Sequence, residues 1–281
     1  MRIKDALKNA REILEACGNE DHDFDARCLC EYCFEMCGTK LALSLEREAD
    51  EQSVKKLKEL VKRRCSGEPL QYILGEWEFM GKSFFVGEGV LIPRPETELL
   101  VETVSGYIKN SRLDKFVVYD LCAGSGCIGI SIALQNPKTQ VFAVEKYGGA
   151  FNYLEKNIKR YALKNIHAQK GDILTSETRE SLPTADVILS NPPYIKSGEI
   201  ASLQAELSYE PVCALDGGED GLLFYRALVS WLDNLSPTGI MALEIGDEQA
   251  EDIEKLFKNR CGEIKIIKDY SGHDRIALIK M

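Results

Sequence analysis

Hydrophobic positions in the first quarter of the chain recur with the period of a helix. Apolar residues spaced three and four apart form one side of each segment, and polar residues form the other, which predicts amphipathic helices. The segments with this period are residues 3–16, 23–36 and 50–65. A glycine follows each of the first two, and we expect Gly18 and Gly38 to end those helices. Residues 1–70 are therefore predicted to form a small helical bundle.

The hydrophobic pattern changes between residues 70 and 93. Aromatic and β-branched residues stand between glycines in residues 72–79 and 84–87. Such runs are typical of short strands that are joined by a tight turn. We therefore expect residues 71–95 to form a β-hairpin linker between the helical domain and the rest of the chain.

After a helix predicted over residues 97–109, short apolar runs alternate with helical segments. The predicted strands are residues 116–121, 141–145, 166–170, 187–190, 240–245, 264–269 and 275–280. Alternation of strands and helices is typical of a mostly parallel sheet with helices on both faces, which binds ligands at the carboxyl ends of its strands. Residues 96–281 are therefore expected to form an α/β domain with a seven-stranded, doubly wound, Rossmann-like sheet.

A glycine-rich loop follows the first of these strands. It begins at Asp120, opens a helix predicted over residues 128–135, and precedes a strand that ends in Glu145. In a nucleotide-binding βαβ unit, glycines let the backbone approach the ligand, and an acidic residue at the second strand end receives ribose hydroxyls. The NAD-binding pattern G-x-G-x-x-G is also present, at Gly124, Gly126 and Gly129. An NAD-binding protein, catalytic or not, is therefore one alternative.

Asp120 distinguishes between two kinds of cofactor. A carboxylate at this strand end would repel the pyrophosphate of a dinucleotide, whereas S-adenosylmethionine carries an ammonium and a sulfonium and has no phosphate. Asp120 therefore favours S-adenosylmethionine. A second explanation of Asp120, as a residue that caps the next turn, remains open.

The tetrapeptide Asn191-Pro192-Pro193-Tyr194 ends the apolar run at residues 185–190. It presents hydrogen-bond acceptors and almost no donors, because proline has no backbone NH. The Asn191 side-chain oxygen and the Pro192 carbonyl are placed to accept the two hydrogens of a planar NH2 group, and the Tyr194 ring to lie against its plane. A strand end of this kind is therefore a candidate site for methylation of an amide or amino nitrogen.

Composition indicates an acidic, soluble globular protein. Of the 281 residues, 44% are hydrophobic and 28% are charged, and the formal net charge is -10. Because Lys and Arg must neutralise phosphates, this balance argues against DNA as a partner, and a solvated helix explains the basic residues between Lys55 and Arg64. No segment approaches the ~18 apolar residues of a membrane span, and no signal peptide is visible. We expect a cytoplasmic protein without a membrane partner and with reduced thiols.

The chain contains ten cysteines, four of them close together in the helical region. These four are Cys28, Cys30, Cys33 and Cys37. A metal site is one interpretation, but the last three are spaced along one face of a helix, which favours core packing. His22, His167 and His273 lack the spacing of metal ligands or of a catalytic triad. We therefore expect no metal.

Several motifs together resemble the protein-(glutamine-N5) methyltransferases of the HemK/PrmC family. The resemblance is carried by residues 68–75, 91–98, 120–126, 191–194, 216–222 and 269–275. It implies a helical substrate-recognition domain, a hairpin, and a seven-stranded methyltransferase domain. It further implies methylation of the glutamine in the Gly-Gly-Gln loop of class I peptide chain release factors. Cys122 and Ala123 depart from the common loop pattern, and a sister group that methylates a glutamine of a large-subunit ribosomal protein shares a Cys in this loop, so that glutamine is an alternative substrate. An adenine N6 nitrogen is another alternative, because N6-adenine methyltransferases use the same Asn-Pro-Pro-Tyr tetrapeptide on a flipped base.

The resemblance also implies the site residues. S-adenosylmethionine, which becomes S-adenosylhomocysteine, is expected to contact Cys122, Ala123, Gly124, Ser125, Gly126, Glu145, Asp172, Ile173 and Asn191. The catalytic residues implied are Asn191, Pro192 and Tyr194, and the substrate-binding residues are these three with Pro193. Arg94, Glu96 and Glu98 are expected to form a lid or entry rim; the alternative is that Glu96, Thr97 and Glu98 cap the helix that follows. The enzyme is expected to act as a monomer.

Overall fold

The computed structural model describes residues 1–111, 113–202 and 205–281. The described residues form two compact units. Those of Met1–Glu76 and Gln204–Tyr209 make up the first unit, and those of Trp77–Leu203 and Glu210–Met281 make up the second. The assignment of separate roles to residues 1–70, 71–95 and 96–281 stays a prediction.

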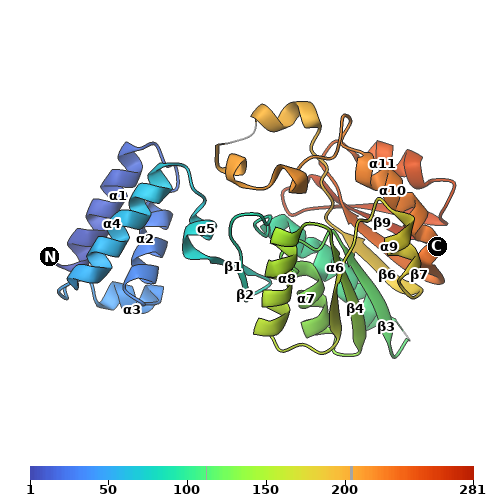
Figure 1. Cartoon of the computed structure of the whole chain (residues 1–281), viewed down its shortest axis with the longest axis horizontal. Helices are drawn as coiled ribbons and strands as arrows, with labels where there is room; N and C mark the ends of the chain where they lie inside the picture. The colour runs from blue at the N-terminus through green and yellow to red at the C-terminus, as the bar shows by residue number, and fades with distance from the viewer. Residues whose placement is uncertain (112, 203–204) are drawn as a thin grey trace. The chain divides into compact units, whose positions relative to one another are not determined.

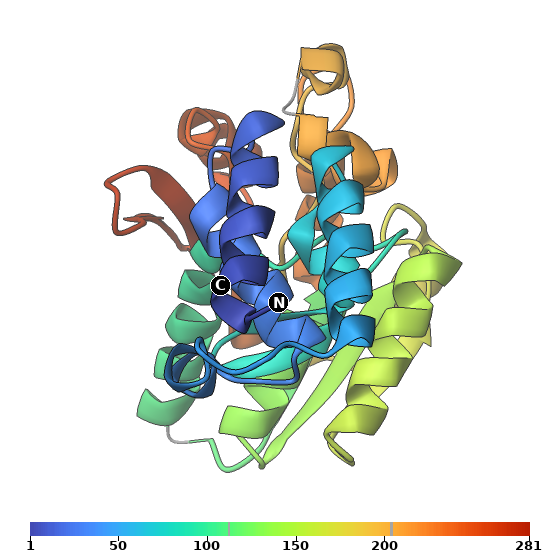
Figure 2. The same ribbon diagram turned by 90° about the vertical axis from the view of Figure 1, so that its left-hand side faces the viewer.

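The first unit is a helical bundle (Figures 1 and 2). Its α-helices are α1 (Ile3–Ala16), α2 (His22–Cys33), α3 (Gly38–Leu43), α4 (Glu51–Cys65) and α5 (Leu70–Leu74). Helices α1, α2 and α4 pack against one another through buried residues such as Leu14, Leu29 and Leu57. Gly18 ends α1 in the left-handed conformation, as predicted.

Two expectations for this region are wrong. Gly38 begins α3 instead of ending α2, which stops at Cys33, just before Glu35 adopts a φ of 52°. Residues 72–74, expected in a strand, belong to α5, whose buried Leu70 and Ile73 lie three residues apart. Short apolar runs do not distinguish a strand from a buried helical turn.

The cysteines behave in two ways. Cys30 and Cys33 are buried in α2, and Cys37 lies outside that helix and is exposed. Cys17 and Cys65 form a disulfide between the ends of α1 and α4, with Cα atoms 5.7 Å apart. The expectation of reduced thiols is wrong for this pair, because helix packing brings the two residues together. In the part of the chain that the structure describes, no group of three or more His, Cys, Asp or Glu side chains is arranged as a metal site.

The hairpin comprises β1 (Glu76–Phe79) and β2 (Lys82–Phe85), which form a two-stranded sheet. Phe79 and Phe84 are buried and pack edge to face. The turn is attached to the first residue of α6 (Glu98–Asn110), because the Glu98 carboxylate accepts a hydrogen bond from the Met80 NH at 2.6 Å. Glu98 therefore anchors the hairpin and does not form a rim.

The second unit contains a seven-stranded sheet in the order β5-β4-β3-β6-β7-β9-β8. Its strands are β3 (Phe116–Leu121), β4 (Thr139–Glu145), β5 (Ile166–Lys170), β6 (Ala185–Ser190), β7 (Leu235–Glu244), β8 (Glu263–Lys268) and β9 (Asp274–Lys280). All neighbours pair in parallel except β9, which is antiparallel to β7 and β8. The predicted doubly wound α/β fold is confirmed.

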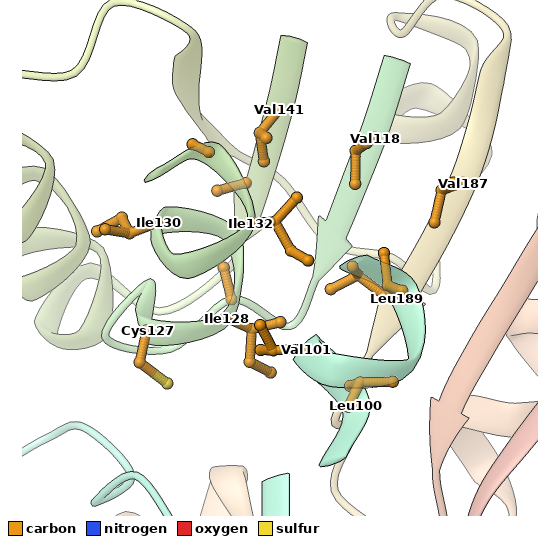
Figure 3. Packing of buried hydrophobic residues seen from close by; sticks show 14 of the residues in the cluster. Leu100, Val101, Val118, Cys127, Ile128, Ile130, Ile132, Val141, Val187 and Leu189 are labelled. Atoms are coloured by element: carbon orange, nitrogen blue, oxygen red, sulfur yellow. The ribbon is translucent and has the colours of Figure 1, made fainter. Parts of the chain in front are cut away.

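Each face of the sheet is covered by helices. On one face, Val118, Val187 and Leu189 pack against α6 and α7 (Cys127–Gln135), as Figure 3 shows. Helix α8 (Gly148–Arg160) contributes Leu154 to the same cluster. On the other face, the alternate strand residues, such as Leu121, pack against α10 (Leu223–Trp231) and α11 (Ala250–Phe257). The strands are apolar on both sides, as parallel strands between two helical layers must be.

The remaining helical segments are short. They are η1 (Pro95–Thr97), α9 (Ser176–Glu180), η2 (Ser197–Ser202), η3 (Ala205–Tyr209), η4 (Val212–Ala214) and η5 (Leu232–Asn234). Within the described ranges, every helix falls short of the length and apolar character that a membrane-spanning segment requires.

Candidate active site

A cavity lies where the parallel strands end. Its wall brings together residues from the loops that follow β3, β4, β5 and β6. Nine of the predicted site residues line it: Cys122, Ala123, Gly124, Ser125, Glu145, Asp172, Ile173, Asn191 and Pro193. Gly126, Pro192 and Tyr194 are not among the lining residues. Four separate strand ends thus form one site at the position expected for this fold.

The glycine-rich loop is shaped by left-handed backbone and by close packing. Gly124 and Gly126 have φ values of 55° and 80°, and Cys122 adopts 61° without being a glycine. Gly129, in the first turn of α7, lies directly against the end of β3. A Cβ atom at Gly129 would lie 2.7 Å from a carboxylate oxygen of Asp120. The loop can therefore approach both the helix and the cavity only with small residues at these positions.

Asp120 is fully buried and does not line the cavity. Its Oδ2 accepts a hydrogen bond from the Gly129 NH at 2.8 Å, so it caps the start of α7. Burial raises the pKa of Asp120 to about 7, the Gly129 hydrogen bond opposes the rise, and the charge of Glu145 adds to it. Of the two explanations of Asp120, capping is the one that this geometry displays.

Glu145 and Asp172 place two carboxylates at the cavity. The Glu145 oxygens accept hydrogen bonds from the backbone NH groups of Gly124 at 2.9 Å and Tyr147 at 2.7 Å, and burial raises the pKa of this carboxyl. Asp172 pairs with Lys146 at 2.8 Å and accepts a hydrogen bond from the Leu174 NH. Glu145 is thus held by the glycine-rich loop and by its own loop, Asp172 is held by neighbours at the cavity, and both carboxylates retain further acceptor capacity.

Asn191 is half-buried, and its amide is anchored on one side. Its Nδ2 donates a hydrogen bond to the hydroxyl of Thr97 at 3.1 Å. Since the amide nitrogen is used in this way, the amide oxygen is the atom available to a ligand. Thr97 lies in η1, on the segment that precedes α6. Proximity of Thr97 to Asn191 is a tertiary feature of the site.

Tyr194 lies outside the cavity wall and is held by its backbone. The Tyr194 carbonyl accepts a hydrogen bond from Gln249 at 3.2 Å. A Cβ atom at Gly217 would lie 2.7 Å from the Tyr194 Cα, so the segment after Asp216 passes very close to it. Burial raises the pKa of the Tyr194 hydroxyl to about 12. The expected contact between the Tyr194 ring and the substrate amide stays a prediction.

Two further segments line the cavity without having been predicted as site residues. Val90, Leu91, Pro93 and Thr97 come from the segment before α6, and Pro211, Cys213, Ala214 and Phe224 come from the region around η4 and α10. Apart from Val90, the first segment lies within residues 91–98, a motif that carries the family resemblance, so the sequence could have indicated that this segment lines the site. No periodicity or motif singled out the second.

Glu210 joins these two segments. Its buried carboxylate accepts a hydrogen bond from the Ile92 NH at 2.9 Å and pairs with the guanidinium of Arg94. Arg94 itself lines the cavity. Of the three residues with open roles, Arg94 lines the cavity, whereas Glu96 and Glu98 are not among its lining residues. Thr97, at the N-terminus of α6, makes no side-chain capping hydrogen bond.

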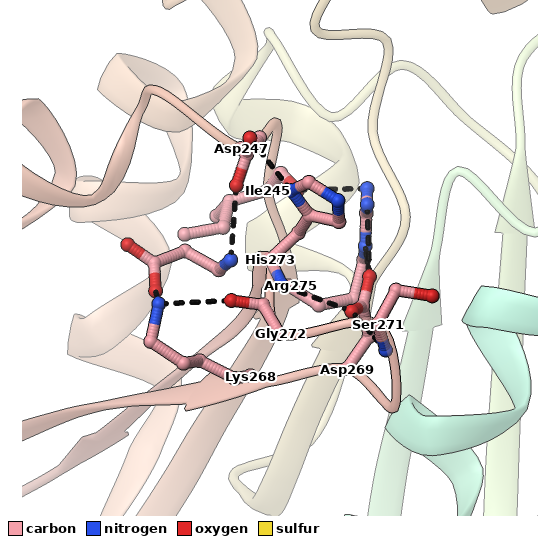
Figure 4. Close-up of polar contacts among 9 residues, drawn as sticks. Ile245, Asp247, Lys268, Asp269, Ser271, Gly272, His273 and Arg275 are labelled. Atoms are coloured by element: carbon pink, nitrogen blue, oxygen red, sulfur yellow. Dashed lines mark hydrogen bonds and ion pairs between the residues drawn. The ribbon is translucent and has the colours of Figure 1, made fainter.

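The motif at residues 269–275 forms a polar turn between β8 and β9 (Figure 4). Asp269 accepts hydrogen bonds from Arg275, His273 contacts Asp247 at 2.9 Å, and Lys268 pairs with Asp274 at 2.7 Å. Arg275 is partly buried and lies near enough to Tyr194 and Glu244 for their charges to raise its pKa, although burial acts in the opposite direction. This turn is thus tied to the segment after β7, because Arg275 donates to the Ile245 carbonyl and His273 contacts Asp247.

Comparison with known proteins agrees with this geometry. Residues 5–75 match the PrmC N-terminal domain family, and residues 95–212 match the methyltransferase small domain family. The release factor glutamine methyltransferase of Clostridium acetobutylicum is 36% identical over 282 residues, covering 99% of this chain and 98% of that protein. The Bacillus cereus protein of the same name is 35% identical over 286 residues, covering 100% of both.

Among solved structures, the 16S rRNA N2 G1207 methyltransferase of T. thermophilus, in complex with AdoMet and guanosine, has a TM-score of 0.52. It is 19% identical and covers 73% of this chain and 49% of that one, so this likeness concerns the fold. The resemblance drawn from the sequence motifs is confirmed by the two full-length relatives. The chain belongs to the release factor glutamine methyltransferase family of enzymes.

Proposed function

We propose that the chain transfers a methyl group from S-adenosylmethionine to the side-chain amide nitrogen of the glutamine in the Gly-Gly-Gln loop of class I peptide chain release factors. One observation carries this proposal: a single cavity joins the glycine-rich loop, Glu145 and Asn191. Names of the full-length relatives support the substrate class.

The charges of the cavity fit a cationic cofactor without phosphates. Glu145 and Asp172 contribute carboxylates to the wall. In the described part of the chain, the cations of the wall are Lys146 and Arg94, and each is already paired with a carboxylate. A pyrophosphate would lack a free cation there, whereas an ammonium and a sulfonium would meet an acidic environment. S-adenosylmethionine therefore fits this donor set better than NAD.

The residues of the chain hold the two reactants. Cys122 to Gly126 would offer backbone groups to the cofactor, Glu145 would accept hydrogen bonds from its ribose hydroxyls, and Asp172 and Ile173 would hold its adenine. When bound, S-adenosylmethionine supplies an electrophilic methyl group. These contacts would fix the position of the methyl group relative to Asn191. That position is the main requirement, because the reaction gains its rate from the orientation and proximity of the two reactants.

On the substrate side, Asn191 Oδ1 and the Pro192 carbonyl accept the two hydrogens of the glutamine amide. Pro193 adds no competing donor and lines the cavity. With both hydrogens held, the nitrogen lone pair turns toward the methyl group. A bond forms between carbon and nitrogen, the bond between carbon and sulfur breaks, and the nitrogen then releases one proton to water. This chemistry needs no strong base before the transfer.

The test is a methylation assay with labelled S-adenosylmethionine followed by mass mapping of the product. Intact class I release factor should be labelled on the glutamine of its Gly-Gly-Gln loop. A release factor with alanine in place of that glutamine is the matched control and should remain unlabelled. Large-subunit ribosomal proteins and adenine-containing single-stranded DNA are the competing substrates, and transfer to either one, with the release factor untouched, would refute the proposal.

Two further expectations follow from the same proposal. Because translation termination takes place in the cytoplasm, the enzyme is expected there, and the absence of a DNA or membrane partner stays a prediction. A monomer is also predicted, since each unit described here carries its own hydrophobic core.

A further inference from the structure

Glu244 ends strand β7 beside the proposed amide-binding residue. Strands β6 and β7 are parallel, with Ser190 paired to Leu243, so Glu244 and Asn191 are neighbours at the carboxyl edge of the sheet. Leu243 and Ile245 belong to the apolar cluster on one face. Glu244 therefore faces the opposite side, where η1 and α6 cover the sheet.

Glu244 is only 2% exposed, and among the residues that the structure describes its carboxylate has no ion pair, which is unusual for a buried acid. Within the described ranges, its Oε2 has no hydrogen-bond partner. The side chains of Thr97 and Asn191 lie near enough to this carboxylate to oppose the rise that burial causes in its pKa. A buried acceptor of this kind costs stability unless its neighbours supply donors, so its retention at the edge of the site calls for a role.

We propose that Glu244 is a positioning residue: its carboxylate holds the Nδ2 side of the Asn191 amide inward, so that Oδ1 faces the glutamine amide of the substrate. This inference rests on the proposed function. Asn191 donates a hydrogen bond to the Thr97 hydroxyl at 3.1 Å. Glu244 lies beside both side chains, since β6 and β7 pair at Ser190 and Leu243 and both side chains act on the pKa of its carboxyl group.

The carboxylate form is needed because it can only accept hydrogen bonds. Facing it, the Asn191 amide must present its NH2 group, which leaves Oδ1 for the substrate. A protonated Glu244 can instead donate to Asn191 Oδ1. The Asn191 amide can then flip and present its NH2 group to the substrate. The NH2 groups of Asn191 and of the substrate glutamine then face each other, and neither accepts a hydrogen bond. Protonation of Glu244 therefore weakens the site without removing any of its residues.

This role predicts a dependence on pH. Burial raises the pKa of Glu244 to about 7; hydrogen bonds from Thr97 and Asn191 and the charge of Arg275 oppose the rise, and Glu96 adds to it. The working form is the carboxylate, so turnover should rise with pH through about 7.

Other titratable groups face Glu244, namely Glu96, Cys127, Tyr194, Tyr225 and Arg275. Burial raises the pKa of Tyr194 and of Cys127 to about 12, so neither changes charge near neutral pH. Asp120, farther along the sheet edge, has a pKa raised to about 7. The wild-type profile alone therefore does not identify the titrating group, and variants are required.

The first experiment compares Glu244→Gln with Tyr225→Phe in the full-length chain. Tyr225 donates to the backbone carbonyl of Glu244 at 2.8 Å and not to its carboxylate, so it is a matched control for packing. We expect Glu244→Gln to lower kcat by about ten- to hundredfold, to leave the KM for release factor nearly unchanged, and to remove the rise of turnover near neutral pH. Tyr225→Phe should keep that rise. Calorimetry should give both variants wild-type affinity for S-adenosylmethionine.

A second measurement does not depend on activity. With selective nitrogen labelling of asparagine, the side-chain amide resonance of Asn191, assigned by its loss in Asn191→Ala, should titrate near the pKa of Glu244 in the substrate-free wild type. It should not titrate in Glu244→Gln. If wild-type enzyme methylates no glutamine, the proposed function fails and this resonance alone decides the role of Glu244. Two results would overturn the inference. One is a Glu244→Gln enzyme with the turnover and pH profile of the wild type, and the other is an Asn191 resonance that does not change with pH in the wild type.

Discussion

Each polar side chain at the cavity uses part of its hydrogen-bonding capacity within the protein. Glu145 accepts from two backbone NH groups, and Asn191 donates to Thr97. These internal bonds hold the side chains before any ligand arrives. A site that is already organised loses less entropy when it binds, so single substitutions here should affect either cofactor affinity or turnover, depending on the atom removed.

Glu145→Ala should weaken binding of S-adenosylmethionine. The substitution removes charged acceptors for ribose hydroxyls, each worth about 1.5 to 3 kcal/mol, or roughly ten- to a hundredfold in affinity. Calorimetry measures the change, with NAD titrated in parallel. Glu263→Ala, which breaks an exposed pair with Lys280, is the matched control. Unchanged affinity in Glu145→Ala, or binding of NAD alone, would contradict the assignment.

Asn191→Ala should separate chemistry from cofactor binding. Without Oδ1, one amide hydrogen of the substrate is no longer held, and turnover should fall by about 100-fold while cofactor affinity changes little. Asn234→Ala serves as the control, because Asn234 bonds to the Arg179 carbonyl away from the cavity. Single-turnover rates decide the matter: near-normal chemistry in Asn191→Ala would refute the role of its oxygen.

At the scale of elements, the start of α7 links the fold to the site. The helix begins directly after the glycine-rich loop, and Asp120 at the end of β3 caps its first turn. Burial of α7 against the sheet, through residues such as Ile130 and Ile132, fixes where the loop lies. A change that moves this helix by a fraction of an ångström should therefore also move the glycine-rich loop at the cavity.

Gly129→Ala tests this link. The added Cβ atom would lie 2.7 Å from the Asp120 carboxylate, so the helix start or Asp120 must move. We expect loss of stability of about 1 to 3 kcal/mol and weaker cofactor binding. In contrast, Gly106→Ala, in the middle of α6, adds a Cβ atom that meets nothing within 4 Å and should be neutral or stabilising by up to about 1 kcal/mol. Urea unfolding and calorimetry distinguish the two; equal effects would show that the contact at Gly129 is unimportant.

At the scale of the whole molecule, chemistry and recognition are expected to reside in different units. All residues of the cavity belong to the second unit. A single glutamine side chain offers too few atoms to select one protein among many, so selectivity must come from a second surface. The helical region, of which residues 5–75 match the PrmC N-terminal domain, is the candidate for that surface.

Removal of residues 1–75 should therefore raise the concentration of intact release factor needed for methylation, by about tenfold or more, because those contacts are lost. A short Gly-Gly-Gln peptide, which reaches only the cavity, should be affected far less. Circular dichroism and cofactor calorimetry establish that the truncated protein is folded. If it retains full efficiency on the intact protein, the helical unit is a stability element.

Local sequence patterns were sufficient to predict those elements whose backbone conformation depends on residues near in the sequence. Strand β3 and strand β5 have the predicted bounds, and β4, β6 and β7 end at or within one residue of the predicted positions. In a parallel sheet these ends share one edge, so the loop, Glu145 and Asn191 could be placed together in advance. Local pattern was insufficient at Gly38 and at residues 72–74, where short apolar segments form helices because of packing within the first unit.

The sequence by itself determined the fold class, the family and the edge of the sheet at which ligands bind, because periodicity and loop glycines act over a few residues. Only the tertiary structure decided which distant segments complete the cavity. Glu210 bonds to Ile92 across more than a hundred positions, and Thr97 meets Asn191 across a similar span. It also placed Tyr194 outside the cavity wall and Glu244 beside Asn191. Such contacts depend on how helices pack on the sheet, and burial and charge at a site follow from that packing.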